Sequence, residues 1–442
     1  MPYAIDLFSG AGGMSEGLIQ AGFHILFSSD INEDVERTYT NRHEQLGLIQ
    51  GINTYYHRGD IRELTGQFIT DCIENLQMFE NENLPRDIDA IFGGPPCQGF
   101  SRAGRRNATD PRNLLFREYL RVISEVNPKY VVMENVVGFL DTKFFGFIGV
   151  TGHVYADGMT APQILRQEFE RIGYQTLEPR ILDAADYGVP QRRNRIIFIA
   201  YRNGVEAPQY PQPLIVNEED KVTITEAISD LIRNNRIRNR IFHGKMSQFQ
   251  RDSINGRTPN INGQTVHSNG VIHNNEYSMH TGLIEERFSL FKEGEDGNRL
   301  RIRVATQGVN LRNKTCLVRH CSEKLRITED EVIRLYRGRN LDNVLLDLLL
   351  TKKSIRTRLD RNRPSATVMT IADDYISPFE DRTFTVRELA RLQSFDDSFV
   401  FLGKRTTGGI RRRVEVPQYS QVGNAVPPLL AKAIALEIIC VL

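Results

Sequence analysis

Short apolar runs alternate with longer stretches of helical periodicity over the first 200 residues. The apolar runs have the length and continuous hydrophobicity of buried strands, at residues 3–8, 24–28, 88–92, 129–133 and 196–201. Between them, apolar side chains recur every three or four positions, as in residues 14–21, 114–126 and 162–172. Strands that alternate with helices predict an α/β fold with a doubly wound, mostly parallel sheet.

The alternation stops at a proline-rich linker that contains Pro208, Pro211 and Pro213. Residues 214–380 are richer in Asn, Arg and Gly, and residues 328–350 form their clearest helical region. This composition predicts a smaller, irregular second domain.

The end of the chain regains clear helical signals. Thr385 and Glu388 form a capping box that opens a helix over residues 387–394. Residues 429–441 predict a final apolar helix, which needs the N-terminal sheet as its partner. The predicted parts are therefore residues 1–207, residues 208–405, which include the segment 363–395, and residues 406–442, which pack back on the first part.

The composition of the 442 residues, 40% hydrophobic and 25% charged, is that of an ordinary globular protein. No apolar run approaches the ~18 residues that a membrane span requires, and the first residues lack the basic and apolar regions of a signal peptide. The five cysteines are widely scattered and do not suggest a disulfide framework. Cys316, His320 and Cys321 have no second pair at a suitable spacing, so we predict no metal site. A cytoplasmic protein without membrane contact is expected.

The net charge of +1 conceals an uneven distribution. Residues 1–200 carry 19 Lys and Arg against 26 Asp and Glu, whereas the remainder carries 37 against 29. The basic residues of the second part gather in three runs, at 231–260, 299–326 and 352–363. One such run is usually a solvated face, but three in one region indicate a surface that faces phosphates.

A glycine-rich turn at residues 10–13 follows the first predicted strand and precedes a helix. Backbone N–H groups in such a turn can meet a nucleotide-like ligand. Asp30 ends the next strand, where a carboxylate can accept hydrogen bonds from both hydroxyl groups of a ribose. Asp6 lies just before this turn. The turn is therefore less suited to a pyrophosphate than the turn of the dinucleotide-binding pattern.

Cys97 follows the predicted strand at 88–92 in a turn of two glycines and two prolines. A thiol presented at a strand end is a candidate nucleophile, although a free cysteine is often only a small core residue. Glu134 directly follows the predicted strand at 129–133. Because ligands of doubly wound folds bind at the carboxyl ends of the strands, Gly10, Asp30, Cys97 and Glu134 are expected at one edge.

These blocks and their order resemble the DNA (cytosine-5) methyltransferases, specifically the compact bacterial modification type. The matching segments are residues 6–13, 30–31, 60–61, 93–101, 134–136, 191–195, 363–370, 385–395 and 421–428. The resemblance implies a Rossmann-like methyltransferase fold with a catalytic domain at 1–207 and a target-recognition domain at 208–405. It also implies transfer of a methyl group from S-adenosyl-L-methionine to C5 of a cytosine in a specific duplex DNA sequence, after the base is flipped out of the helix.

Cytosine C5 is a poor nucleophile until a thiolate attacks C6 and adds electron density to the ring. By resemblance, Cys97 is that nucleophile, Glu134 protonates N3, and Arg193 and Arg195 line the cytosine pocket. The cofactor residues implied by the family are Phe8, Gly10, Gly12, Gly13, Asp30, Ile31, Asp60, Ile61, Pro95, Leu115, Asn424 and Val426. The DNA-binding residues expected from the polar segment after Cys97, which we expect to close as a lid, and from the first basic run are Gln98, Ser101, Arg102, Arg105, Arg106, Arg112, Arg236, Arg238 and Arg240.

Two other interpretations are open. A tRNA cytosine-5 methyltransferase of the same fold would carry a smaller recognition region and a Cys-Phe-Thr signature, which this sequence lacks. A catalytically silent DNA-binding relative is disfavoured because Cys97, Glu134 and both arginines are present; a nicotinamide oxidoreductase would leave Cys97 and Glu134 unused. We expect a monomer that acts on duplex DNA at the nucleoid, either as an orphan modification enzyme or beside a cognate restriction endonuclease.

Overall fold

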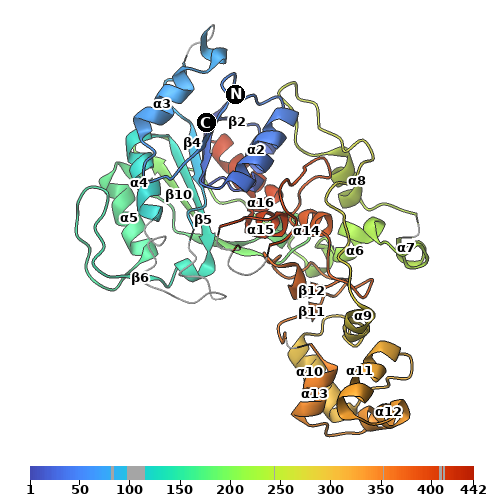
Figure 1. Cartoon of the computed structure of the whole chain (residues 1–442). Helices are drawn as coiled ribbons and strands as arrows, with labels where there is room; N and C mark the ends of the chain where they lie inside the picture. Colours follow the sequence, from blue (N-terminus) through green and yellow to red (C-terminus); the bar gives the residue numbers. More distant parts are fainter. Residues whose placement is uncertain (81–83, 97–114, 243, 352, 408–410, 412–413) are drawn as a thin grey trace.

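The computed structural model describes the whole chain except residues 81–83, 97–114, 243, 352, 408–410 and 412–413 (Figure 1). An eight-stranded sheet lies at its centre, in the order β3-β2-β1-β4-β5-β10-β8, with β9 paired to β10. The parallel strands are β1 (Tyr3–Leu7), β2 (His24–Asp30), β3 (Tyr55–Arg58), β4 (Ala90–Gly93) and β5 (Tyr130–Val136). The antiparallel strands are β8 (Tyr174–Thr176), β9 (Arg180–Asp183) and β10 (Asn194–Arg202). The predicted mostly parallel sheet is confirmed.

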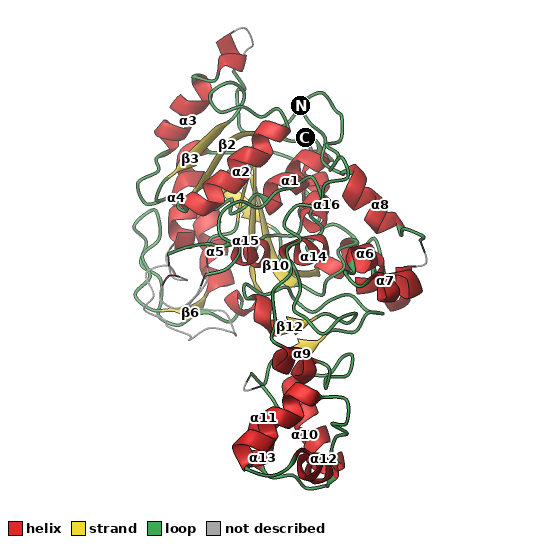
Figure 2. Cartoon of the chain, turned by 45° about the vertical axis from the view of Figure 1, so that its right-hand side comes forward, coloured by secondary structure: helices red, strands yellow, loops and turns green. Residues whose placement is uncertain are grey.

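Helices cover both faces of this sheet (Figures 1 and 2). One face carries α3 (Gly66–Glu74), α4 (Leu115–Val126) and α5 (Ala161–Arg171), and the other carries α1 (Gly13–Ala21), α2 (Glu33–Gln45) and α16 (Pro428–Ile439). Alternate residues of β1 therefore enter different cores: Ile5 and Leu7 pack with α3 and α4, while Ala4 packs with α1 and α16. The final helix packs on the N-terminal half, as the sequence predicts.

Short elements complete the body around the sheet. They are η1 (Gln77–Glu80), η3 (Val137–Phe139), β6 (Lys143–Phe144), β7 (Met159–Thr160), η4 (Ala184–Tyr187), η5 (Glu218–Asp220), α6 (Ile224–Ile228), η6 (Ser229–Leu231), α7 (Asn235–Phe242), α8 (Gln248–Asn255), η7 (Ala372–Asp374), α14 (Val386–Leu392) and α15 (Gln418–Asn424). A third core joins α6, α14 and α15 with Ala11 of the glycine turn. Helices that come before and after the separate helical domain in the sequence therefore pack against the glycine turn near the N-terminus.

A separate helical domain projects from the body beyond the small sheet of β11 (Thr357–Arg358) and β12 (Tyr375–Ile376) (Figures 1 and 2). Its helices are α9 (Gly282–Phe288), α10 (Gly297–Gln307), α11 (Thr315–Leu325), α12 (Glu329–Arg337) and α13 (Asn343–Leu349). They enclose a core of their own. The composition of residues 214–380 predicts an irregular region with one clear helical stretch, whereas residues 282–349 form five short helices whose apolar residues converge on one cluster. The helix expected at 328–350 is two helices, since Gly338 and the left-handed Asn340 (φ 60°) interrupt it.

Two strands are longer than their apolar runs. β2 continues to Asp30, which pairs with Arg58, and β5 continues to Val136, which pairs with Arg195. Pairing with a neighbouring strand extends the ladder beyond the hydrophobic run. Glu134 therefore lies within β5, opposite Ile197, and not beyond its end.

One stretch of the described residues, 418–439, is long and apolar enough to cross a membrane by length and composition alone. This corrects the expectation that no run approaches that length. The stretch comprises α15 and α16, and 61% of its apolar window is buried in the protein. It is a core element that packs against α1.

Candidate active site

The turn that precedes Cys97 is held against the end of β5. Asn135 Nδ2 donates to the Pro95 carbonyl oxygen at 3.2 Å. A Cβ at Gly93 would lie 2.8 Å from the Leu7 carbonyl oxygen, so only glycine lets β4 approach β1 this closely. A Cβ at Gly94 would lie 3.3 Å from Glu134 Oε2. The backbone two to three residues before Cys97 is therefore next to the Glu134 carboxylate.

The predicted residues between 97 and 112 lie outside the described residues. They are Cys97, Gln98, Ser101, Arg102, Arg105, Arg106 and Arg112. Their assigned roles stay predictions, and the described chain resumes at Leu115, the first residue of α4.

Glu134 and Arg195 form an ion pair across adjacent strands. Arg195 Nε lies 2.5 Å from Glu134 Oε1, and both side chains are 12% exposed. Because β5 and β10 run antiparallel, a carboxylate and a guanidinium far apart in the sequence meet at one edge of the sheet. A pair so placed presents an acceptor and several donors to a ring that approaches this edge.

Arg193 occupies a different environment from Arg195. It is 2% exposed, and its guanidinium donates to the carbonyl oxygens of Gly423 at 3.0 Å and Val368 at 3.4 Å. Its Nε has no partner among the described residues. Burial, with the charge of Arg195 nearby, lowers the pKa of Arg193 well below its usual range. The family resemblance implies one pocket for both arginines, whereas the described hydrogen bonds of Arg193 join the residue before β10 to the backbone of Val368 and Gly423.

Gly10 and Asp30 meet as the sequence suggests. Gly10 N donates to Asp30 Oδ2 at 3.1 Å, and Asn32 N donates to Asp30 Oδ1 at 3.0 Å. Burial raises the pKa of Asp30, and these backbone hydrogen bonds oppose the shift. The turn itself requires glycine, because Gly12 has φ 98° and a Cβ at Gly13 would lie 2.2 Å from the Val426 carbonyl oxygen.

The remaining predicted cofactor residues are dispersed around this turn. Ile31 is 65% exposed beside Asp30, and Asp60 follows β3 with its carboxylate paired to Arg62. Ile61 is buried in the core under α4. Phe8 (φ 57°) lies next to the turn, and Asn424 is an exposed residue at the end of α15.

A buried hydroxyl network beneath the turn was not assigned from the sequence. Ser15 Oγ donates to Asp6 Oδ2 at 2.5 Å and lies 2.6 Å from Tyr39 OH, which in turn lies 2.5 Å from Ser28 Oγ. Burial raises the pKa of Asp6 to about 7, and the hydrogen bond from Ser15 opposes this shift. The polar Asp6 in an otherwise apolar strand is the sequence signal that could have identified the network.

The basic runs differ in how many of their cations form ion pairs. In the run 352–363, Arg358 pairs with Asp381 and Arg361 pairs with Glu293. In the first run, Arg257 is held by Asp396, whereas α7 carries Arg236, Arg238 and Arg240 without an ion-pair partner among the described residues. Figure 1 shows α7 on the side of the body opposite β6.

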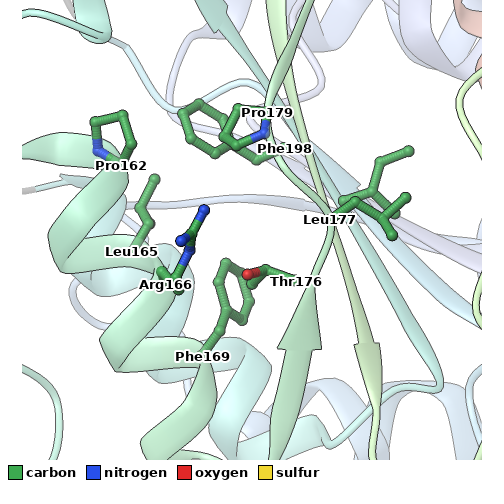
Figure 3. Close-up of a pocket in the computed structure, with 9 residues that line it drawn as sticks. Pro162, Leu165, Arg166, Phe169, Thr176, Leu177, Pro179 and Phe198 are labelled. Carbon is green, nitrogen blue, oxygen red and sulfur yellow. The ribbon is translucent and has the colours of Figure 1, made fainter.

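Among the described residues no group of His, Cys, Asp and Glu could hold a metal ion. A small pocket between α5 and the β8–β10 region has a mostly apolar lining, drawn in Figure 3, that includes Leu165, Phe169 and Phe198. None of the predicted site residues lines it.

A family model described as C-5 cytosine-specific DNA methylase matches residues 3–440. The chain belongs to this family. It is 30% identical over 433 residues to the type II methyltransferase M.DdeI of Desulfomicrobium norvegicum, across 98% of this chain and 87% of the relative. It is 33% identical over 434 residues to the type II methyltransferase M1.HphI of Haemophilus parahaemolyticus, across 98% and 85%.

Solved structures agree in fold. A methyltransferase encoded within an E. coli prophage superposes with a TM-score of 0.63 at 23% identity, and the match covers 100% of this chain and 99% of that chain. The chain is therefore a DNA (cytosine-5-)-methyltransferase, which confirms the resemblance and the activity inferred from the sequence. The methyltransferase fold is confirmed as well. Its substrate is DNA.

Proposed function

We propose that this methyltransferase modifies one cytosine in a specific duplex DNA sequence by covalent catalysis from Cys97, with Glu134 and Arg195 acting on the flipped base. The observation that supports this proposal is the Glu134–Arg195 ion pair, which lies beside the turn that leads into Cys97.

In the proposed reaction the Cys97 thiolate adds to C6, and the electron pair moves toward N3 and C5. A free cysteine has a pKa of ~8.5, so only a small fraction is thiolate at neutral pH. The guanidinium of Arg195 favours the thiolate and binds the exocyclic oxygen O2 of the base, while Glu134 delivers to N3 a proton that it takes up from solvent when the base enters the site. Once C5 carries the transferred methyl group, loss of the C5 proton and expulsion of Cys97 as a thiolate restore the aromatic ring.

S-adenosyl-L-methionine is the proposed methyl donor and supplies an activated methyl group. The residues fit such a ligand: Asp30 is anchored by backbone N–H groups beside the exposed Ile31, and the glycine turn leaves no room for a side chain at Gly13. Asp30 would hold the ribose, and residues 10–13 the methionine end. The other assigned contacts, including Asp60, Pro95, Leu115 and Val426, belong to the same proposal.

The finer organisation is also proposed. Residues 1–207 and 406–442 would form the catalytic unit, and 208–405 would contain the target-recognition domain. We infer a monomer that acts in the cytoplasm at the nucleoid, with a cognate restriction endonuclease as a candidate companion. The family of C-5 cytosine-specific DNA methylases disfavours the tRNA alternative. The presence of Cys97, Glu134, Arg193 and Arg195 disfavours a catalytically silent relative.

Bisulfite sequencing of DNA methylated by the protein first identifies the target cytosine. The decisive experiment then uses duplex DNA with 5-fluorocytosine at that position. Fluorine at C5 cannot leave as a proton does, so the enzyme should stay bound to the base through a bond that survives denaturing electrophoresis. Cys97→Ala should form no such adduct and transfer no labelled methyl group. An adduct or full methyl transfer with Cys97→Ala would overturn the mechanism.

A further inference from the structure

The helical domain carries an unusual number of cations without acidic partners. Eight basic residues lie between positions 312 and 339, and among the described residues none has a carboxylate within ion-pair distance. They are Arg312, Lys314, Arg319, Lys324, Arg326, Arg334, Arg337 and Arg339. All but the half-buried Lys314 are exposed. We call these eight residues the α11–α12 surface.

The neighbouring cations on α10 behave differently. Arg301 Nη1 lies 2.7 Å from Asp347 Oδ1, and Arg303 Nε lies 2.7 Å from Glu295 Oε1. Arg299 lies 3.6 Å from Asp296. The second basic run of the sequence therefore divides: its α10 part is neutralised inside the domain, and its α11 part is not.

The acids nearest to the α11–α12 surface are engaged elsewhere. Glu331 accepts from both Thr328 N and Thr328 Oγ1 at 2.7 Å in the capping box of α12. Glu329 and Asp330 lie in the same first turn, where the helix dipole favours negative charge. Residues 312–339 thus contain eight cations and four acids. Three of the acids stabilise the start of α12, and the fourth, Glu323 in α11, has no ion-pair partner among the described residues.

We propose that the α11–α12 surface is the part of the helical domain that contacts DNA phosphates. Exposed cations left unpaired by the fold repel one another, and this repulsion is relieved when phosphates neutralise them. The paired cations of α10 and of residues 353–363 would have to break an ion pair first. The inference rests on DNA being the substrate and refines which residues of the recognition region hold it.

The test compares two double variants of the full-length protein that each lose two positive charges from the helical domain. Arg319→Gln with Arg326→Gln removes unpaired cations, and the matched control, Arg299→Gln with Arg301→Gln, removes paired ones. Binding of a fluorescent 30-base-pair duplex is measured by anisotropy between 50 and 300 mM salt. Each lost phosphate contact lowers the slope of log K against log salt by about 0.9.

In the Arg319→Gln, Arg326→Gln variant, the magnitude of the slope of log K against log salt should fall by up to about 2. The Arg299→Gln, Arg301→Gln control should keep the wild-type slope. A second pair, Arg334→Gln in α12 with Arg339→Gln just after it, repeats the measurement if the first variant loses helical circular dichroism. An unchanged slope in both unpaired variants, or an equal loss in the α10 control, would overturn the inference. Failure of the wild-type protein to bind duplex DNA would instead count against the substrate.

Discussion

The contact between α1 and α16 offers a quantitative test of how the donor site is supported. A Cβ at Gly17 would lie 2.5 Å from Ala431 Cβ, 2.5 Å from the Pro428 carbonyl oxygen and 2.6 Å from Lys432 N. Ordinary contact begins at 3.4 Å, so Gly17→Ala forces the helices about 0.9 Å apart. Overpacking of this kind costs roughly 1–3 kcal/mol, while alanine gains ~1 kcal/mol of helix propensity over glycine.

Two of the three close contacts involve backbone atoms, which cannot rotate away. We therefore expect a net destabilisation of about 1–2 kcal/mol, at the upper end of that balance. Because α1 starts at Gly13, the shift should also move the glycine turn and weaken S-adenosyl-L-methionine binding more than DNA binding.

Urea unfolding followed by circular dichroism measures the stability, and equilibrium dialysis measures donor affinity. The double variant Gly17→Ala with Ala431→Gly removes the side-chain clash but places a glycine inside α16, which costs ~1 kcal/mol of helix propensity, so it should recover at most part of the loss. A Gly17→Ala protein as stable as wild type would refute the packing argument. Full recovery in the double variant would show that the backbone contacts are not limiting.

Three further predictions concern charge. Glu134→Gln should keep DNA affinity but lose 10²-fold or more in turnover, the usual contribution of a general acid; an unchanged single-turnover rate would assign N3 protonation to another group. Asp6 has its pKa raised to about 7, so the folded state binds a proton that the unfolded chain releases above pH ~4, and stability should fall as pH rises from about 4 to 7. In Asp6→Asn the unfolding free energy should fall less over that range, and an identical slope would contradict the assignment. Replacing Arg236, Arg238 and Arg240 by Gln should reduce the salt dependence of DNA binding, and an unaltered slope would remove α7 from the DNA-binding surface.

Much of the fold was predictable because its signals are local. The capping box of Thr385 and Glu388 forms with Thr385 Oγ1 bonded to Glu388 N, at the expected start of α14. Alternating strands and helices placed Gly10 and Asp30 at one edge, and their hydrogen bond is present. The helical domain was harder to predict, since its helices are short and their shared core joins residues far apart in the sequence.

The sequence by itself determined the family, the order of its motifs and the meeting of Gly10 with Asp30, because each depends on short motifs and on the alternation of strands and helices. Only the tertiary structure decided which charged side chains are buried, which form ion pairs and which stay unpaired. Arg193 and Arg195 are two residues apart, yet one is buried on backbone carbonyls and the other pairs with Glu134. Ion pairs such as Arg361–Glu293 join residues far apart in the sequence, so only the fold separates the paired cations from those without an ion-pair partner.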